Sequence, residues 1–274
     1  MAEDRTSISA YAIQGSAAEE HRLAVLAQVM SAATARLFAE IGVAAGWNAL
    51  DVGSGGGQVS TTLAALVAPT GAVTGVDIDE TTVRHAADSA RDRGVTNVSF
   101  DRADAYALPY RDRFDLAYGR LVLCYLTEPV AALREMRAAV RPGGIVAVED
   151  VFTDTLRSDP PIPALADLRR IYGATVRAHG GDPTIGPRLP ALFRAAGLVD
   201  VQATSMVNVL GTSEEKGFLV TLVDSMRAST LEAGAASATE LDAMKAAVQA
   251  AVDDPDCTFY QARIHQVFGV RASS

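Results

Sequence analysis

Short apolar runs alternate along the chain with longer segments whose apolar residues recur at helical spacing. The runs lie at 49–52, 72–77, 97–101, 114–118 and 144–150, and the helical segments between them at 58–68, 80–93 and 128–140. Alternation of strands and helices is the signature of parallel βαβ units, and strands that are apolar along their length are typical of a sheet covered on both faces. This part of the chain therefore predicts five parallel strands.

Two longer strand-like segments follow at 199–210 and 258–270. They predict two further strands that pair antiparallel at one edge of the sheet. We therefore expect an α/β fold, with a Rossmann-like, seven-stranded, mostly parallel sheet and helices on both faces, in a single domain over 1–274. The sheet is expected within about 45–210 and 258–270.

Three pieces of the chain have no place in this sheet, at about 1–43, 153–186 and 213–252. They are largely helical in pattern, and the last contains a hinge of small residues at 233–237. Insertions at the carboxyl edge of an α/β sheet often cover a ligand crevice, so these pieces predict a helical lid. The alternative is that they only pack on the outside.

Composition and charge narrow the classes of partner. The chain has 33 Asp and Glu against 24 Lys and Arg, a net charge of −9 that disfavours nucleic acid. Its two cysteines, Cys124 and Cys257, indicate a reducing compartment. The N-terminus is acidic where a signal peptide would be basic, and no unbroken apolar run approaches the roughly 18 residues that a membrane span needs. We expect a cytoplasmic protein that contacts neither nucleic acid nor membrane.

The glycine-rich segment at 51–57 is the most informative motif. It follows a predicted strand and opens a helix, and its glycines have the spacing Gly53-x-Gly55-x-Gly57. A dinucleotide fingerprint would place its third glycine at position 58, where this chain has Gln58, and the Gly-Lys-Ser/Thr of a P-loop is missing. Glycines in such a turn let a ligand approach the main chain closely.

Acidic residues mark the ends of the neighbouring strands. Asp77 ends the second predicted strand, where a carboxylate can accept hydrogen bonds from two ribose hydroxyls. Asp104 follows the third strand, placed to accept from an adenine amine or else to form a turn. We assign Asp79 to an N-cap, and for Asp51 we favour ordering of the glycine loop over ligand contact.

These motifs, in this order, resemble the class I S-adenosylmethionine-dependent methyltransferases. The matching elements lie within about 45–150 and end in the Pro-Gly-Gly turn at 142–144, and a weaker match continues at 189–198. The small-molecule methyltransferases of natural-product and quinone biosynthesis are the most similar group. Ser54 departs from the cysteine that many relatives have there.

The resemblance implies a set of cofactor contacts for S-adenosyl-L-methionine. Gly53, Ser54 and Gly55 would contact its methionine part, and Arg120 would lie beside the amino-acid end. Asp77 would hold the ribose. Ile78, Asp104 and Ala105 would contact the adenine. An N-terminal segment that includes Tyr11 and Arg22 would cover the cofactor.

Methyl transfer from a sulfonium needs alignment and exclusion of water, and a general base only if the acceptor must lose a proton. Glu149, at the end of the fifth strand, is our leading candidate for that base. The other candidates near the expected crevice are Asp150, His179, Asp182, Tyr118, Tyr125 and His21. Each has a purely structural alternative, and no set of residues predicts a metal site.

We predict methyl transfer to a small organic acceptor, with a role in secondary metabolism and with a homodimer left open. The first alternative is a member of the same fold that uses the bound cofactor for a rearrangement or cyclisation without methylation. A nicotinamide dehydrogenase is the second, which the 53/55/57 spacing disfavours. A non-catalytic partner subunit is the third.

Overall fold

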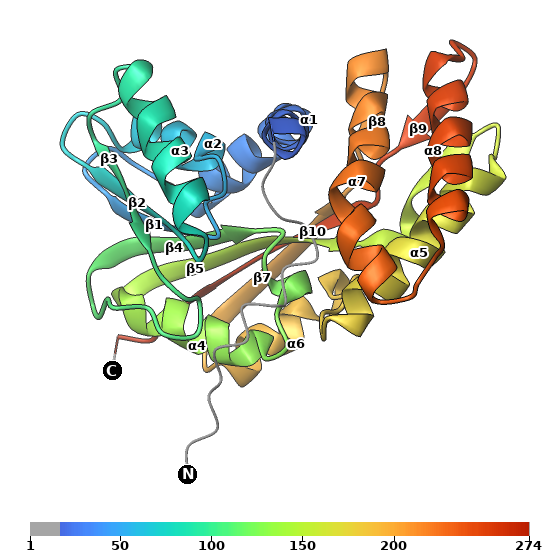
Figure 1. The fold of residues 1–274 in the computed structure, drawn as a ribbon. Coiled ribbons are helices and arrows are strands. Elements are labelled where there is room, and N and C mark those ends of the chain that lie inside the picture. Colours follow the sequence, from blue (N-terminus) through green and yellow to red (C-terminus); the bar gives the residue numbers. More distant parts are fainter. Residues whose placement is uncertain (1–16, 274) are drawn as a thin grey trace.

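A computed structural model describes residues 17–273, with side chains described from Arg22 on. Its centre is a seven-stranded sheet with the order β3-β2-β1-β4-β5-β10-β7 (Figure 1). The strands are β1 (Asn48–Val52), β2 (Ala72–Asp77), β3 (Val98–Arg102), β4 (Phe114–Arg120), β5 (Val140–Phe152), β7 (Val199–Met206) and β10 (Arg263–Val270). All neighbours among β1–β5 are parallel, and β10 runs antiparallel to both β5 and β7. The predicted α/β class and mostly parallel seven-stranded sheet are confirmed.

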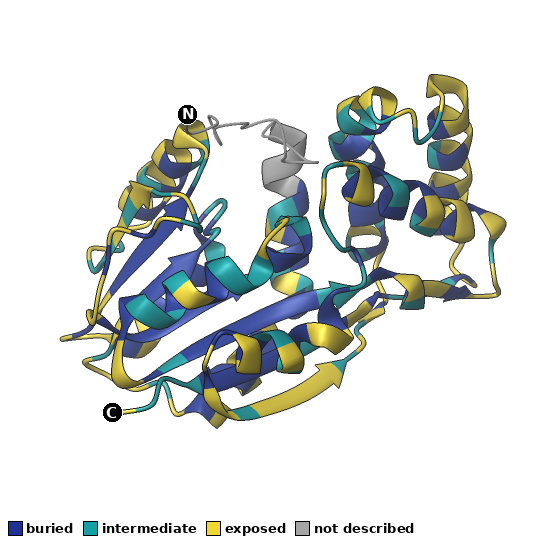
Figure 2. Cartoon of the chain, turned by 90° about the horizontal axis from the view of Figure 1, so that it is seen from below, coloured by how far each residue is buried: buried dark blue, intermediate teal, exposed yellow. Residues whose placement is uncertain are grey.

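Helices cover both faces of the sheet. On one face lie α1 (Ala17–Ile41), α2 (Gln58–Val67) and α3 (Glu80–Asp92), and on the other lie α4 (Pro129–Ala139) and α6 (Leu189–Ala195) (Figure 1). The central strand β4 is buried at nearly every position, whereas the edge strand β7 is mostly exposed (Figure 2). This contrast follows from the pattern, since continuous apolar runs need cover on both faces.

The two last predicted strands are each divided in the structure, which corrects the sequence-based boundaries. The first segment gives β7 and then β8 (Val209–Leu210), and the second gives β9 (Thr258–Tyr260) and then β10. A second, three-stranded sheet, β6-β9-β8, includes the short strand β6 (Arg157–Asp159). The division occurs where the Gln261 amide donates to the Asn208 carbonyl at 2.8 Å and that of Arg263 donates to Thr155 Oγ1 at 2.6 Å. The alternation of apolar and polar residues along one strand does not reveal hydrogen bonds to segments that are distant in the sequence.

The pieces predicted as a lid pack against one another. Helices α5 (Pro163–Ala178), α7 (Ser213–Glu232) and α8 (Ala238–Asp253) share one apolar cluster with Val25, Leu26 and Met30 of α1. The turn from α7 to α8 lies at the predicted small-residue hinge, where Gly234 adopts φ +62°. Together with the small sheet they form a helical unit beside the large sheet (Figure 1).

A buried carboxylate attaches α1 to the large sheet. Glu149 of β5 has no exposed surface, and its oxygens accept hydrogen bonds from Thr34 at 2.8 Å, Tyr118 at 2.9 Å and Gln266 at 2.5 Å. These donors come from α1, β4 and β10, so one side chain joins three sheet strands to the helix above them. The Phe38 ring of α1 adds an edge contact with Tyr118.

Among the described helices, α1 is the one whose stretch Arg22–Ile41 is long and apolar enough to cross a membrane by length and composition. The search of the sequence for an unbroken apolar run did not identify this stretch, because polar residues interrupt it. In the structure its residues Leu37 and Phe38 are buried against the large sheet.

We expect Glu149→Ala to lower the free energy of unfolding by at least about 3 kcal/mol, because it leaves three buried donors without an acceptor. Urea denaturation monitored by circular dichroism measures this. Glu40→Ala, at an exposed position of α1, is the control and should change stability by less than about 0.5 kcal/mol. A loss below about 1 kcal/mol for Glu149→Ala would contradict the anchoring role.

Candidate functional site

The glycine loop joins β1 to α2 in a conformation that requires glycine. Gly53, Gly55 and Gly57 have φ values of +69°, +50° and +77°, in the left-handed region that side chains disfavour. A Cβ on Gly53 would also lie 2.3 Å from Cγ2 of Val122. The amides of Gly53 and Ser54 donate to the Val76 carbonyl at 2.8 and 2.9 Å, which holds the loop against the end of β2.

Asp77, at the end of β2, faces this loop. Its carboxylate accepts from the Gly55 amide at 3.1 Å through Oδ2 and from the Asp79 amide at 3.1 Å through Oδ1. Burial raises the pKa of the Asp77 carboxyl, and these two amide donors oppose the rise. A carboxylate has about four acceptor positions, so each oxygen keeps capacity for one hydroxyl donor. The arrangement fits the predicted ribose contact.

Asp51 has the structural role that the sequence favoured. The Ser60 hydroxyl of α2 donates to its Oδ2 at 2.6 Å, so this buried carboxyl ties the end of β1 to the helix after the loop. Burial raises the pKa of Asp51 to about 6, and the charge of Arg120 acts against that rise. Among the described residues Arg120 makes no salt bridge.

Asp79 caps α3 as predicted, accepting from the Thr82 amide at 2.8 Å. Asp104 is exposed, and its Oδ1 accepts from the Tyr106 amide at 2.9 Å, the geometry of its turn alternative. The Ala103 amide donates to the Asp77 carbonyl at 3.0 Å, which brings the segment with Asp104 and Ala105 beside the end of β2. The adenine contacts of this segment stay predictions.

The buried Ser54 hydroxyl has no hydrogen-bond partner among the described residues. An unpaired buried hydroxyl costs free energy unless something else pairs with it. It lies between Gly53 and Gly55, where the sequence predicts the cofactor's methionine part. Ile78, at the other predicted contact, is partly exposed beyond the end of β2. The residues present therefore fit a bound nucleoside cofactor at this edge of the sheet.

A pocket that sequence reasoning did not find lies between this edge and the helical unit. It encloses about 80 Å³ and is predominantly apolar. We call it the acceptor pocket, and its lining residues are Arg22, Leu26, Leu121, Tyr125, Val151, Thr153, Leu156, Leu168, Arg169, Tyr172, Phe218, Leu219, Leu222, Gln261, Ala262 and Ile264. Leu121 follows β4 and Val151 belongs to the end of β5, so the pocket adjoins the carboxyl ends of the central strands.

The acceptor pocket contains a pair of tyrosine hydroxyls and a buried threonine hydroxyl. The hydroxyls of Tyr125 and Tyr172 lie 2.9 Å apart, and burial raises the pKa of both phenols. The Thr153 hydroxyl is buried without a hydrogen-bond partner among the described residues. Arg22 lines the same pocket, and its charge acts against the raised pKa values of both tyrosines. Only Tyr125 and Arg22 had been singled out from the sequence.

The geometry does not support Glu149 as the general base. Its carboxylate is fully buried under α1 and is engaged by three donors, which favours a structural role. The sequence predicted Glu149 at the end of the fifth strand, whereas β5 continues to Phe152, and the pattern did not indicate which face of the sheet its side chain takes.

Three of the other predicted bases make hydrogen bonds within the protein that favour structural roles. Asp150 is fully buried and accepts from the Cys124 and Val151 amides, and burial raises its pKa to about 6. Asp182 binds Thr184 and Arg188, and His179 contacts the Thr175 carbonyl at the end of α5.

Tyr11 and the side chain of His21 lie outside the described residues. Within the part of the chain that is described, no three His, Cys, Asp or Glu side chains gather as a metal site.

Comparison with known proteins gives the family of this fold. Residues 44–179, about half of the chain, match the family model described as "Methyltransferase domain". The chain is 34% identical over 183 residues to the methyltransferase GfsG of Streptomyces halstedii, which covers 66% of this chain and 63% of GfsG. It is 35% identical over 133 residues to the ubiquinone/menaquinone biosynthesis C-methyltransferase UbiE of Ectopseudomonas mendocina, covering 48% of this chain and 50% of UbiE.

Among solved structures, the [4+2]-cyclase SpnF aligns with a TM-score of 0.53 at 23% identity, over 84% of this chain and 76% of SpnF. Identity at this level establishes the shared fold alone. The aligned part of the chain spans 63% of GfsG and 50% of UbiE, which is less than two thirds of the length of each of these curated relatives.

We expect Asp77→Ala to weaken binding of S-adenosylmethionine by more than about tenfold, because each lost bond to a charged acceptor is worth about 1.5–3 kcal/mol. Isothermal titration calorimetry measures the affinity. Asp79→Ala is the matched control: it removes a nearby acid that caps α3, and should cost about 1–2 kcal/mol of stability with affinity nearly unchanged. Equal affinities for the two variants would contradict the assignment of Asp77.

The raised pKa of Asp51 predicts a pH dependence. The unfolded chain loses this proton near pH 3.8 and the folded chain near pH 6. The group therefore stabilises the fold at low pH, and that contribution is lost as pH rises through this window. In Asp51→Asn the loss disappears, so stability relative to wild type should rise between pH 4 and 6.5 by up to about 3 kcal/mol. Urea denaturation at three pH values measures it, and a constant difference would contradict the buried carboxyl.

Proposed function

We propose a methyl-transfer function from the premise that this chain carries a class I S-adenosylmethionine-dependent methyltransferase domain. The acceptor is a small organic molecule that enters the acceptor pocket. The observation that carries the proposal is the position of this pocket, whose residues Leu121 and Val151 adjoin the same sheet edge as the glycine loop.

S-adenosylmethionine, when bound, supplies a methyl group already activated on a sulfonium. The chain's own residues then have two tasks, alignment and exclusion of water, and alignment alone supplies about 7–11 kcal/mol. The Asp77 carboxylate orients the ribose, and the left-handed backbone at Gly55 lets the ligand approach the loop. Leu26, Leu121 and Phe218 exclude water from the side where the acceptor enters.

The acceptor pocket favours a largely apolar acceptor with a few hydrogen-bonding groups. Its unpaired Thr153 hydroxyl and the Tyr125–Tyr172 pair are positioned to bind and orient such groups. Because burial raises the pKa of both phenols, they stay protonated at neutral pH and cannot take the acceptor's proton. We therefore propose that the acceptor is nucleophilic by itself or has lost its proton to bulk solvent before it enters the pocket.

A role in secondary metabolism is the finer part of the proposal. The motif resemblance to the small-molecule methyltransferases of natural-product and quinone biosynthesis supports it. The similarity to UbiE, a C-methyltransferase of ubiquinone/menaquinone biosynthesis, supports an acceptor of the quinone class. A cytoplasmic location is proposed on the two cysteines, both of which are buried and free. The single-domain assignment and the homodimer also stay proposals.

The same site could serve a rearrangement or cyclisation without methylation. This alternative is favoured by one observation: among the described residues, the acceptor pocket is lined by no carboxylate and no histidine. A rearrangement or cyclisation that only needs the substrate to be held in a folded conformation beside the bound sulfonium would need neither a carboxylate nor a histidine. The two reactions differ in their products, since only methylation consumes the cofactor.

We expect the purified protein, given S-adenosylmethionine and a panel of demethylated quinols, phenols and amines, to release S-adenosylhomocysteine together with a product heavier by one methylene. Mass spectrometry measures both products. Asp77→Ala is the control and should lower turnover at sub-saturating cofactor by about tenfold or more. A failure of the wild-type protein to bind S-adenosylmethionine in calorimetry would overturn the proposal. A substrate isomerised without S-adenosylhomocysteine would establish the alternative.

A further inference from the structure

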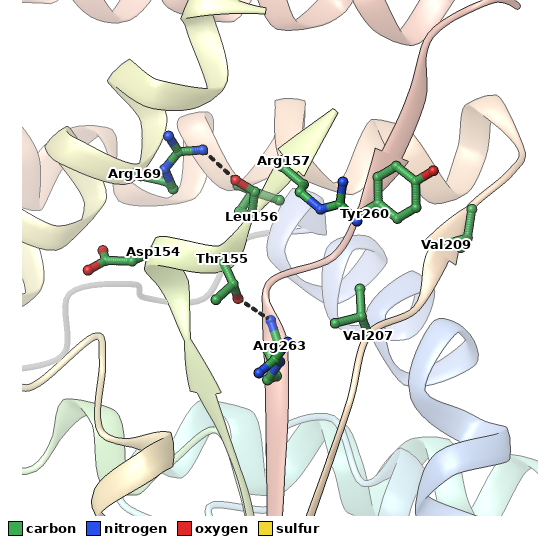
Figure 3. Close-up of a pocket in the computed structure, with 9 residues that line it drawn as sticks. All are labelled: Asp154, Thr155, Leu156, Arg157, Arg169, Val207, Val209, Tyr260 and Arg263. Atoms are coloured by element: carbon green, nitrogen blue, oxygen red, sulfur yellow. Dashed lines mark hydrogen bonds between the residues drawn. The ribbon is translucent and has the colours of Figure 1, made fainter. Parts of the chain in front are cut away.

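A second cavity adjoins the acceptor pocket on the side away from the glycine loop. It is open to solvent and encloses about 610 Å³. Its lining residues, all shown in Figure 3, are Asp154, Thr155, Leu156, Arg157, Arg169, Val207, Val209, Tyr260 and Arg263. Leu156 and Arg169 line both spaces, so these two side chains form a common wall. We call this space the arginine cavity.

Three arginines, Arg157, Arg169 and Arg263, line this cavity. The chain has more Asp and Glu than Lys and Arg, and some arginines elsewhere, such as Arg188 and Arg227, form salt bridges. Among the described residues, none of Arg157, Arg169 and Arg263 forms one. The single acid that lines the cavity is Asp154, and Figure 3 shows its carboxylate directed away from the other side chains drawn.

The arginines of the cavity wall are positioned by contacts with neutral groups, which leave their positive charge unneutralised. Arg169 donates to the Leu156 carbonyl, and the Arg157 guanidinium lies 4.1 Å from the centre of the Tyr260 ring. The amide of Arg263 donates to Thr155 Oγ1 at 2.6 Å, which fixes the backbone where β10 begins. Its guanidinium forms no hydrogen bond or salt bridge with the part of the chain that the structure describes. Charged groups that are oriented in advance lose less entropy when a ligand binds.

Apolar surface lies beside the charge. Val207 is 38% exposed and Val209 is 57% exposed, and both line the cavity together with the Tyr260 ring and the arginines. A ligand suited to this space therefore carries an anionic group attached to an apolar body. Guanidinium groups match the planar or tetrahedral oxygens of carboxylates and phosphates in geometry as well as charge.

We propose that the arginine cavity binds an anionic group, a phosphate monoester or a carboxylate, carried by the acceptor whose reactive end occupies the acceptor pocket. This inference rests on the proposed function for the identity of the ligand, but the binding itself does not depend on turnover. Leu156 and Arg169 line both spaces, so a molecule that extends past these two side chains would reach from the acceptor pocket into the arginine cavity. The anionic group then fixes the position of the acceptor.

Calorimetry on the full chain tests the proposal with four probes, octyl phosphate, octanoate, 1-octanol and inorganic phosphate, in 0.15 M salt. We expect the two anionic chain probes to bind at least about tenfold more tightly than 1-octanol, since charged hydrogen bonds exceed neutral ones. Inorganic phosphate should bind at least about tenfold more weakly than octyl phosphate, since it lacks the apolar body. Equal binding of 1-octanol and the anionic probes would overturn the proposal. Equal binding of inorganic and octyl phosphate would assign the site to a free anion instead.

Variants locate the binding within the cavity. Arg157→Gln and Arg263→Gln should each weaken octyl phosphate by about five- to tenfold and leave 1-octanol unchanged. Arg170→Gln is the matched control, an exposed arginine of α5 paired with Asp167 outside the cavity, and should change nothing. Unchanged octyl phosphate binding in both cavity variants would overturn the assignment. Titration of S-adenosylmethionine in the same samples separates the two proposals, because its failure would overturn only the methyl-transfer function.

Discussion

The buried carboxylate of Glu149 is the constraint on which the arrangement of the site depends. A carboxyl without exposed surface must find donors inside the protein. Glu149 finds them on α1, β4 and β10, so the helix is fixed over the centre of the sheet. The N-terminal part of the same helix carries Arg22 and Leu26 into the wall of the acceptor pocket. The pocket wall therefore depends on a bond made several helical turns away.

The acids at the carboxyl edge of the sheet divide their tasks through their hydrogen-bond partners. Asp51 is committed to Ser60 and orders the start of α2, while Asp79 is committed to Thr82 and caps α3. Asp77 accepts only backbone amides, one of them from the glycine loop itself, and so keeps acceptor capacity toward a ligand. Acidity and neighbourhood alone would not separate these three residues, because all lie near the same turn.

Local sequence patterns predicted the five parallel strands, the glycine loop and the Asp79 cap, because strand burial, left-handed turns and capping are decided by residues close in sequence. They failed where distant segments decide the outcome. The division at Gln261 depends on Asn208, and the role of Glu149 depends on Thr34 and Gln266. The acceptor pocket draws Tyr172 and Phe218 from separate helices, whose apolar spacing indicates only that they are helical.

A crystal structure of the protein with S-adenosylhomocysteine tests the central claim most directly, which is that the cofactor lies across the glycine loop with its sulfur toward the acceptor pocket. The account predicts both ribose hydroxyls within hydrogen-bond distance of the Asp77 carboxylate and the sulfur on the side of Leu121 and Tyr125. A nucleoside bound away from Asp77, or a sulfur on the opposite side of the loop from Leu121, would contradict it.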